Sequence, residues 1–499
     1  MAIKDRLSKD KIRAAVQLAD ETLFTSAYSS DANIAKNNED KNKREYIKKL
    51  MEAVFFNNDE RVNVIFYANH SLKDVSDILL EEAKKYNVEQ VIALGIGLED
   101  LGYVDKTARC LILGNCAFDD HLKEKLMWLD NDYRYQWIWH TEEQIKKMVP
   151  VYPNFNHDFK TKIVMLWDDQ AVVPDEYKPK FDELRRIYYN EQLRINEDFW
   201  DTLLYDKEVM TIRADMVAPI PNRYWASRLK CDESCIWSML NDMVYSINSN
   251  EYKEEMARLE EIKRLLNSMQ IKRLHFNTDA GTDFRISLTE HSKWISEPHL
   301  RYNGKRIVRY YNNFPSFEIF TSPDCYTAEG RVVLTKPNFR VGVNEGIYSF
   351  RRGKLTKCQT DNKSWNQKAL DKENNLFRIG EIALVPITSP LNKANIFKAG
   401  ETSDRFFESV INGDPNVTSS GRFNSVNLDE NTGCHLALGD SYTVATDLGN
   451  VSKEIMRKNR FNVANKHFDF VFGDDSISVE AEVSGRRKIL LMEDGKWKI

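Results

Sequence analysis

The sequence of 499 residues lacks the features of several protein classes. It has no apolar run of the ~18 residues that a membrane-spanning helix needs, and its first residues lack the apolar core of a signal peptide. It also lacks a dense stripe of Lys and Arg, and its formal net charge is -5. Such a surface is poorly suited to the phosphates of nucleic acid. We therefore expect a cytoplasmic protein that binds neither a membrane nor nucleic acid.

Cysteine is sparse and irregularly spaced. The chain has seven cysteines, and the closest pair, Cys231 and Cys235, is not followed by a second Cys or His pair at zinc-finger spacing. An odd, scattered set predicts reduced thiols rather than a disulfide framework. Glycine-rich phosphate loops are also missing, because Asp100 stands where a dinucleotide motif beginning at Gly95 needs its third glycine.

What is present describes a globular protein with two or three domains: 42% hydrophobic, 11% aromatic and 29% charged residues. Residues 1–60 read as a helical extension with a solvated charged run. Residues 61–97 predict a β-α-β unit, since a strand-like alternation is followed by apolar residues at helical spacing and a second apolar run. A third strand is expected at 110–114. These elements predict an N-terminal α/β domain over residues 1–270.

The residue pattern of the sequence changes after a charged helix predicted over 250–269. From residue 271 onward short β-like runs are separated by Gly, Asn and Asp. We therefore predict an α/β protein of two domains, in which a strand-rich α+β C-terminal domain over residues 271–499 follows the N-terminal one.

Metal-ligand side chains gather in four stretches of this second half. In HFDF, His467 and Asp469 are two positions apart and so share one face of a strand, while Phe468 and Phe470 share the other. Glu381 stands within the apolar stretch RIGEIALVP, where a buried carboxylate needs a cation or an Arg as partner.

For one such glutamate a structural salt bridge is the commoner outcome. Six candidate ligands in apolar or turn-flanked settings of one domain favour a metal centre instead: Glu318, Glu381, Glu430, His435, His467 and Asp469. Four carboxylates and two neutral imidazoles roughly balance two divalent ions, and these hard oxygen and nitrogen donors suit Zn, Co or Mn.

The order of the motifs resembles the M29 metallopeptidases, the thermophilic aminopeptidase T family. The matching stretches are HFNTDAGTDFRISL (275–288), NNFPSFEIFTSP (312–323), RIGEIALVP (378–386), LDENTGCHLALGDSY (428–442) and the HFDF segment. The resemblance is dense from about residue 275 to the end and thin before it. It implies a metal-dependent aminopeptidase that removes N-terminal residues from peptides with a free N-terminus, and a homodimer.

Carried over by position, the resemblance assigns two divalent metal ions to the six candidate ligands and places Tyr442 beside them. Glu381 is the first candidate for the general base and Glu430 the second. Tyr442 is a candidate donor to the developing oxyanion, although a packed aromatic residue with a satisfied hydroxyl is an equal alternative. His435 is interpreted as a ligand rather than a core histidine.

Departures from the family pattern leave alternatives open. Glu381 and Glu430 are 49 positions apart, which makes room for a polar insertion at 397–422. His435, His467 and Asp469 alone would also form the 2-His-1-carboxylate triad of a mononuclear non-haem iron ring-cleaving dioxygenase. The three glutamates favour the peptidase, since the triad does not need them. A non-catalytic binding protein that retained the fold is the third hypothesis.

Overall fold

The computed structural model divides into two compact units, which are described separately: residues 1–213 with 220–241, and residues 214–219 with 242–499. The structure describes residues 32–56, 58, 60–68, 73–94, 102–105, 110–113, 141–147, 149, 157–167, 178–206, 211–212, 214–221, 225, 233–244, 249–302, 307–311, 313–338, 341–369, 375–393, 423, 425–449 and 451–499. The start of the helical extension, the glycines at 95 and 97 and the insertion at 397–422 lie outside these residues.

The first unit is built on a mainly parallel sheet. Strands β3, β4, β2, β1 and β5 are neighbours in that order, and only the β3–β4 pair among them is antiparallel. Their bounds, with those of a short hairpin, are β1 (Val62–Ala68), β2 (Val88–Leu94), β3 (Gly102–Asp105), β4 (Cys110–Leu113), β5 (Lys160–Trp167), β6 (Leu204–Asp206) and β7 (Thr211–Ile212).

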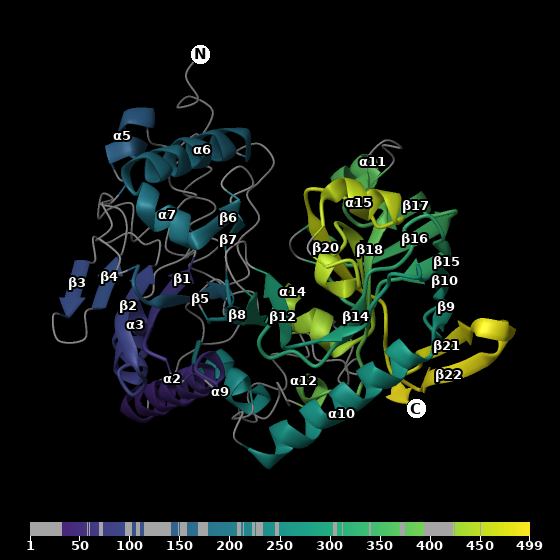
Figure 1. Cartoon of the computed structure of the whole chain (residues 1–499), viewed down its shortest axis with the longest axis horizontal. Coiled ribbons are helices and arrows are strands. Elements are labelled where there is room, and N and C mark those ends of the chain that lie inside the picture. Colours follow the sequence, from purple (N-terminus) through teal and green to yellow (C-terminus); the bar gives the residue numbers. More distant parts are fainter. Residues whose placement is uncertain are drawn as a thin grey trace. The chain divides into compact units, whose positions relative to one another are not determined.

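Helices cover both faces of this sheet (Figure 1). They are α2 (Ala32–Val54), α3 (Lys73–Ala83), α5 (Glu142–Lys147), α6 (Lys178–Ile195), α7 (Glu197–Leu203) and α9 (Glu233–Met243). Strand β1 is almost wholly buried, as a parallel strand between helical layers must be. On one face Ile65 packs with Phe199 and Trp200 of α7. The predicted β-α-β unit is therefore present as β1, α3 and β2, and the predicted third strand as β4.

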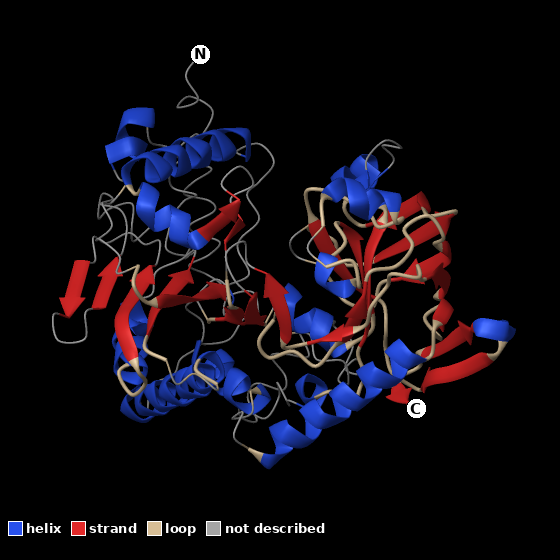
Figure 2. Cartoon of the chain, viewed as in Figure 1, coloured by secondary structure: helices blue, strands red, loops and turns tan. Residues whose placement is uncertain are grey.

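The second unit is rich in strands (Figure 2). Its larger sheet has the order β17-β16-β15-β10-β9-β21-β22-β23, and a five-stranded sheet has the order β11-β14-β18-β19-β20. The bounds are β8 (Met216–Pro219), β9 (Ile271–Asn277), β10 (Asp283–Ser287), β11 (Ile295–Ser296), β12 (His299–Tyr302), β13 (Ile307–Tyr310), β14 (Ile319–Thr321), β15 (Glu329–Val333), β16 (Gly346–Arg351), β17 (Lys354–Thr360), β18 (Ile379–Leu384), β19 (His435–Gly439), β20 (His467–Val471), β21 (Ser478–Val483), β22 (Lys488–Glu493) and β23 (Lys496–Trp497).

Short helices connect these strands. They are α11 (Lys363–Ala369), α12 (Pro390–Lys393), α14 (Val426–Asp429), α15 (Lys453–Lys458) and the 3-10 turns η3 (Asn375–Phe377), η5 (Glu430–Thr432), η6 (Thr443–Ala445) and η7 (Ser484–Arg486). No helix of the described residues is long and apolar enough to cross a membrane.

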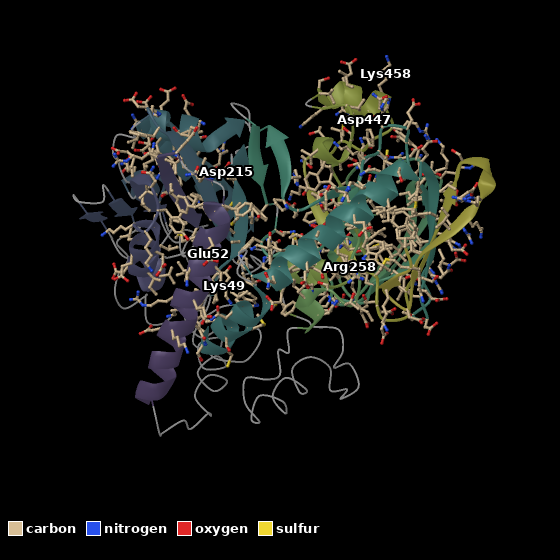
Figure 3. The ribbon with its side chains drawn as sticks, turned by 60° about the horizontal axis from the view of Figure 1, so that its bottom comes forward. Lys49, Glu52, Asp215, Arg258, Asp447 and Lys458 are labelled. Carbon is tan, nitrogen blue, oxygen red and sulfur yellow. The ribbon has the colours of Figure 1, made fainter. Side chains whose placement is uncertain are left out.

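The long helix α10 (Asn250–Ser268) belongs to the second unit. Its buried face carries Leu259, Ile262 and Leu266, while Arg258 lies on its exposed side (Figure 3). Asn267 exchanges two hydrogen bonds with the backbone of Trp294, at 2.9 and 3.0 Å. The compact units thus separate before α10, whereas the sequence boundary near residue 270 falls after it. The domain boundary near residue 270 stays a prediction.

Aromatic side chains join the two sheets of the second unit. Phe470 of β20 lies edge-on to Tyr348 of β16, with ring centroids 5.1 Å apart, and it also contacts Trp365 of α11 at 5.9 Å. Phe470 is buried, but Phe468 is only partly so, although its ring packs edge-on against Trp365 at 5.5 Å. The face of β20 that carries Phe468 and Phe470 is therefore a core face, and His467 and Asp469 lie on the opposite face.

Candidate metal centre

The five-stranded sheet carries five of the six candidate ligands on or beside its strands. Glu318 directly precedes β14, Glu381 lies in β18, and His435 begins β19. His467 and Asp469 both lie in β20. Ligands that are far apart in the sequence, from Glu318 to Asp469, are thus brought onto one sheet.

The strand register places these side chains on one face. Glu381 is opposite Ala437, which is in turn opposite Asp469, and Gly439 is opposite His467. Paired residues of antiparallel strands point to the same side, as do residues two apart on one strand. His435, two positions before Ala437, therefore shares the face of Glu381.

Glu318 reaches the same face through the next strand pair. Phe320 is opposite Ala383, which is opposite His435, and Glu318 is two residues before Phe320. The neighbours of the ligands on this face include the small residues Ala383 and Ala437 and the buried ring of Phe320, which packs in one cluster with Ala383.

A backbone irregularity sets the place of Glu381. The register shifts between Ile379 and Glu381, so that Gly380 is left as the extra residue of a β-bulge. A Cβ atom at Gly380 would collide with the backbone carbonyl oxygens of Gly439 and Asp440. Only glycine permits this close approach of β18 to the end of β19.

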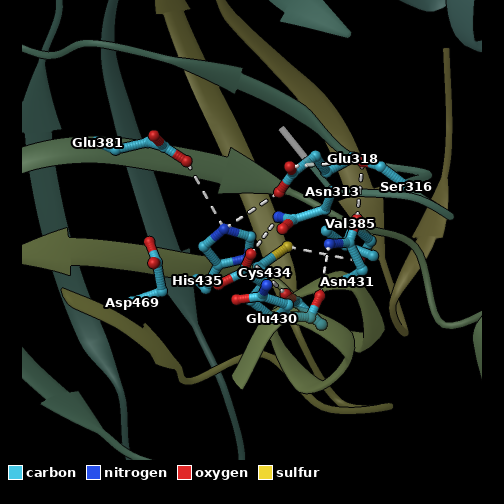
Figure 4. Close-up of polar contacts among 12 residues, drawn as sticks. Asn313, Ser316, Glu318, Glu381, Val385, Glu430, Asn431, Cys434, His435 and Asp469 are labelled. Atoms are coloured by element: carbon cyan, nitrogen blue, oxygen red, sulfur yellow. Dashed lines mark hydrogen bonds and ion pairs between the residues drawn. The ribbon is translucent and has the colours of Figure 1, made fainter. Parts of the chain in front are cut away.

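The first group of candidate ligands surrounds His435 (Figure 4). Nε2 of His435 lies 3.2 Å from Glu318 Oε2 and 3.7 Å from Glu381 Oε1. The side chains of all three are at most 5% exposed. Their ligand atoms lie within 4.8 Å of one another, a spacing that would admit a metal ion between them.

The second group shares Glu381 with the first. Nε2 of His467 lies 3.5 Å from Glu381 Oε2 and 3.1 Å from Asp469 Oδ1. The side chains of His467 and Asp469 are 14% and 10% exposed, so this group is the more accessible of the two. Glu381 therefore directs one carboxylate oxygen to each histidine.

Both imidazoles are oriented by backbone carbonyl groups. Nδ1 of His435 lies 3.2 Å from the carbonyl oxygen of Gly433, and Nδ1 of His467 lies 2.7 Å from that of Asp440. With the proton on Nδ1, each Nε2 has a free lone pair that faces the carboxylates. A bond from Nδ1 to a backbone carbonyl group is typical of metal-binding histidines.

The donor set fits a divalent cation. Within the described residues neither Glu318 Oε2 nor Glu381 Oε2 accepts a hydrogen bond, although both atoms are buried. Lone pairs of carboxylates and imidazoles that face one another repel unless a proton or a cation lies between them. Two histidines and three carboxylates in two overlapping groups thus form a site that a metal would stabilise.

Protons fill this role in the metal-free protein. Burial opposes the imidazolium form of His435, but the adjacent carboxylates of Glu318 and Glu381 outweigh burial and raise the pKa of His435 well above its ordinary value. Burial likewise opposes a charged His467, yet the Asp469 carboxylate raises the pKa to about 9. Burial raises the pKa of Glu381 to about 7. Metal and protons therefore compete for the same atoms.

Glu430 lies apart from the two groups of ligand atoms that the described residues form. It begins η5, is buried, and accepts a hydrogen bond from Nδ2 of Asn313 through Oε1. The structure thus brings together five of the six predicted ligands. The sixth, Glu430, is bound instead by the side-chain amide of Asn313.

Tyr442 and Cys434 flank the centre. The ring of Tyr442 lies on the imidazole of His467, with centroids 4.4 Å apart, and contacts Phe320 edge-on at 6.2 Å. Cys434 is fully buried, and burial raises the pKa of its thiol to about 11. A thiol in this setting stays protonated and is not a nucleophile.

The sequence interpretation missed the amides around the glutamates. Asn313 contacts Glu430, and Asn431 contacts Ser316 and Phe317 beside Glu318. The only local signal was the presence of asparagine within the two motifs that carry these glutamates. Composition around a motif does not reveal which amide reaches which carboxylate.

A family profile and several known proteins match this chain. The profile described as "Thermophilic metalloprotease (M29)" matches residues 208–402 and 409–497. Aminopeptidase PepS of Streptococcus thermophilus is 27% identical over 297 residues, which cover 57% of this chain and 65% of that protein. Aminopeptidase T of Thermus thermophilus is 27% identical over 237 residues, covering 47% of this chain and 51% of that protein. The chain thus spans between half and two thirds of the length of these relatives.

A solved structure shares the fold. Wild-type AmpT from Thermus thermophilus superposes with a TM-score of 0.59 and 18% sequence identity, covering 92% of this chain and 100% of that one. The match confirms the predicted α/β fold class. A 2,5-dihydroxypyridine dioxygenase from Pseudomonas putida gives a TM-score of 0.42 at 11% identity, which is too low to support an argument.

Proposed function

The chain belongs to the thermophilic metalloprotease family M29, and from this premise we propose that it is a metal-dependent aminopeptidase. The family match confirms the resemblance drawn from the order of the motifs. The observation that best supports the proposal is the position of Glu381, whose two carboxylate oxygens face two different histidine–carboxylate groups. A carboxylate shared in this way suits a centre of two metal ions.

In this proposal each group of ligands holds one ion. Glu318, His435 and Glu381 would hold the first, with Glu430 close in sequence to His435 as a further ligand. Glu381, His467 and Asp469 would hold the second. When bound, two divalent ions such as Zn, Co or Mn would lower the pKa of a water molecule and polarise the scissile carbonyl group.

Glu381 is the proposed general base. Its buried carboxylate faces both ligand groups, so in this role one of its oxygens would stay free of metal and accept the proton. It would take a proton from the attacking water and pass it to the nitrogen of the leaving amine. Glu430 is the second candidate, because it is a buried carboxylate that lies outside the two groups.

Tyr442 is proposed to stabilise the developing negative charge. Its ring is held between Phe320 and His467, which fixes the direction of the phenol. A hydroxyl group in this position would donate a hydrogen bond to the carbonyl oxygen as it gains charge.

The substrate class and the setting belong to the same proposal. We propose that the substrate is a peptide with a free N-terminus, as the names of the matched aminopeptidases suggest. We also propose a homodimer in the cytoplasm, on the basis of the family resemblance and of the sequence features. The ligand set and the domain boundary near residue 270 are proposals as well.

The decisive experiment measures peptidase activity and metal content together. The purified, metal-stripped protein is assayed with aminoacyl chromogenic amides after addition of Zn, Co or Mn. Hydrolysis should require metal, should fail with N-acetylated amides, and should reach its maximum at two ions per chain. Inactivity towards all aminoacyl amides at full metal occupancy would refute the proposal, and one bound iron per chain would favour the dioxygenase hypothesis.

A further inference from the structure

Asn431 occupies a central position behind the candidate centre. It follows Glu430 in η5 and is completely buried. Its Oδ1 accepts hydrogen bonds from Ser316 Oγ at 2.9 Å and from the backbone N–H of Phe317 at 3.2 Å. Its Nδ2 donates to the carbonyl oxygen of Asn427 in α14 at 3.1 Å. Because a backbone N–H can only donate, the orientation of the amide group is determined.

These bonds hold the segment that leads to Glu318. Ser316 and Phe317 are the two residues directly before this ligand, and β14 begins directly after it. The segment is not a β-strand, so the sheet ladder does not fix it. A buried side chain that bonds both a hydroxyl group and a main-chain N–H fixes its path instead.

The distances around Ser316 show which group accepts the hydrogen bond from its hydroxyl group. Ser316 Oγ lies 2.9 Å from Asn431 Oδ1 but 3.4 Å from Glu318 Oε1. A hydroxyl group has one proton, and only the shorter distance is normal for an O–H···O hydrogen bond. Asn431 Oδ1 therefore accepts the hydrogen bond from Ser316, and Glu318 Oε1 keeps its lone pairs.

The neighbouring residue supports the same arrangement. Glu430, one position before Asn431, accepts a hydrogen bond from Asn313 at the start of the same segment. The strip of residues 313–317 and the turn η5 are thus joined at both ends by side-chain amides (Figure 4). The segments that carry Glu318 and Glu430 are thereby tied to one another.

We propose that Asn431 is a positioning residue that holds Glu318 in place for the more buried metal ion. This inference rests on the proposed function, because it assigns a metal to Glu318. Asn431 touches neither substrate nor metal and acts through Ser316 and Phe317. Loss of a residue that orients a metal ligand typically weakens metal binding by about 10- to 100-fold.

The test is a metal titration of the metal-free full-length protein with a competing chelator. Asn431→Ala should weaken the binding of one of two ions by about tenfold or more and leave the second nearly unchanged. Ser316→Ala, which removes one of the two bonds and is less disruptive, should give a smaller loss in the same ion. It also serves if Asn431→Ala does not fold.

Asn366 provides a matched control in the same unit. Its Oδ1 likewise accepts from a hydroxyl group and a backbone N–H, both of Thr360, at 2.8 and 2.9 Å. Asn366→Ala should lower the thermal midpoint of the metal-free protein without changing metal affinity. If Asn431→Ala and Ser316→Ala behave in that way too, Asn431 is only structural and the inference is wrong. If the wild-type protein binds no metal, the proposed function itself is wrong.

Discussion

Nδ1 of His467 lies 2.7 Å from the backbone carbonyl oxygen of Asp440. This contact joins β20 to the residue that follows β19, and it turns Nε2 of His467 towards Glu381 and Asp469. The tautomer that a metal ligand requires is therefore set by the main chain. A histidine held in this way is preorganised before any metal arrives.

Substitutions on the two faces of β20 should have different effects, one on metal binding and the other on stability. His467→Ala or Asp469→Ala removes a ligand at a partly exposed position, so we expect metal content and activity to be lost. Above about pH 9, where the raised pKa of His467 no longer stabilises the folded state, the metal-free protein should unfold at nearly the same temperature as the wild type. Phe470→Ala should cost about 3–5 kcal/mol of stability, because the ring is buried against Tyr348.

Phe468→Ala should cost less than Phe470→Ala, since Phe468 is only partly buried. The measurement is metal stoichiometry per folded chain together with the thermal midpoint of the metal-free protein. If His467→Ala lowers that midpoint and retains two ions, the histidine is structural.

Glu381→Gln preserves the shape of the side chain but removes its charge and basicity. We expect activity to fall by about 100-fold or more while the fold persists. Glu82→Gln, a control at another buried glutamate that pairs with Lys85, should leave activity unchanged. A fully active Glu381→Gln protein at saturating metal would contradict the assignment of Glu381.

Tyr442→Phe removes only the hydroxyl group and keeps the ring that packs on His467. If this hydroxyl stabilises the oxyanion, kcat should fall by about 100-fold with little change in KM or metal content. Tyr348→Phe is the control. It removes a buried hydroxyl group that lies away from the centre and accepts a hydrogen bond from Trp365 Nε1 at 2.9 Å. Equal kcat values for Tyr442→Phe and wild type would leave Tyr442 a packing residue.

Gly439→Ala should damage the centre through the backbone. Gly439 has φ +113°, and a Cβ atom there would collide with the carbonyl oxygen of Lys466, next to His467. We expect a loss of more than about 3 kcal/mol of stability together with the loss of metal. Gly449 has φ +74° with nothing near a Cβ atom, so Gly449→Ala should cost only about 1 kcal/mol and retain both ions. Similar losses in both variants would show that φ strain alone matters.

Metal affinity should rise with pH. In the metal-free protein the pKa of His467 is raised to about 9 and that of Glu381 to about 7, so near neutral pH metal must displace protons. Apparent affinity should therefore increase from pH 6 towards pH 9, and each binding event should release protons. Titrations at several pH values, and in buffers of different ionisation enthalpy, measure both effects. An affinity that does not change with pH would contradict this prediction.

The stability of the metal-free protein should change in the opposite direction. A pKa raised above its unfolded value stabilises the folded state at low pH, and this stabilisation is lost as the pH rises. For Glu381 the loss runs from 4.5 to about 7, and for His467 from 6.5 to about 9. The contribution of both groups to the free energy of unfolding should thus fall over this range. Saturating metal should remove this loss.

The sequence by itself determined the parts of this protein that depend on local periodicity and on motif order. The alternation in HFDF predicts that His467 and Asp469 share a strand face, which β20 has. The β-α-β pattern after residue 61 and the α/β fold class follow from the same kind of signal. The ordered motifs identified the family.

Only the tertiary structure decided how these parts meet. The register that aligns Glu381, Ala437 and Asp469 across three strands depends on a bulge at Gly380. The bond from Ser316 to Asn431 crosses 115 positions of sequence. Local patterns encode the face of each strand, because side-chain direction repeats every two residues. Strand pairing and amide partners depend on packing between segments that are distant in the chain, and no single segment contains that information.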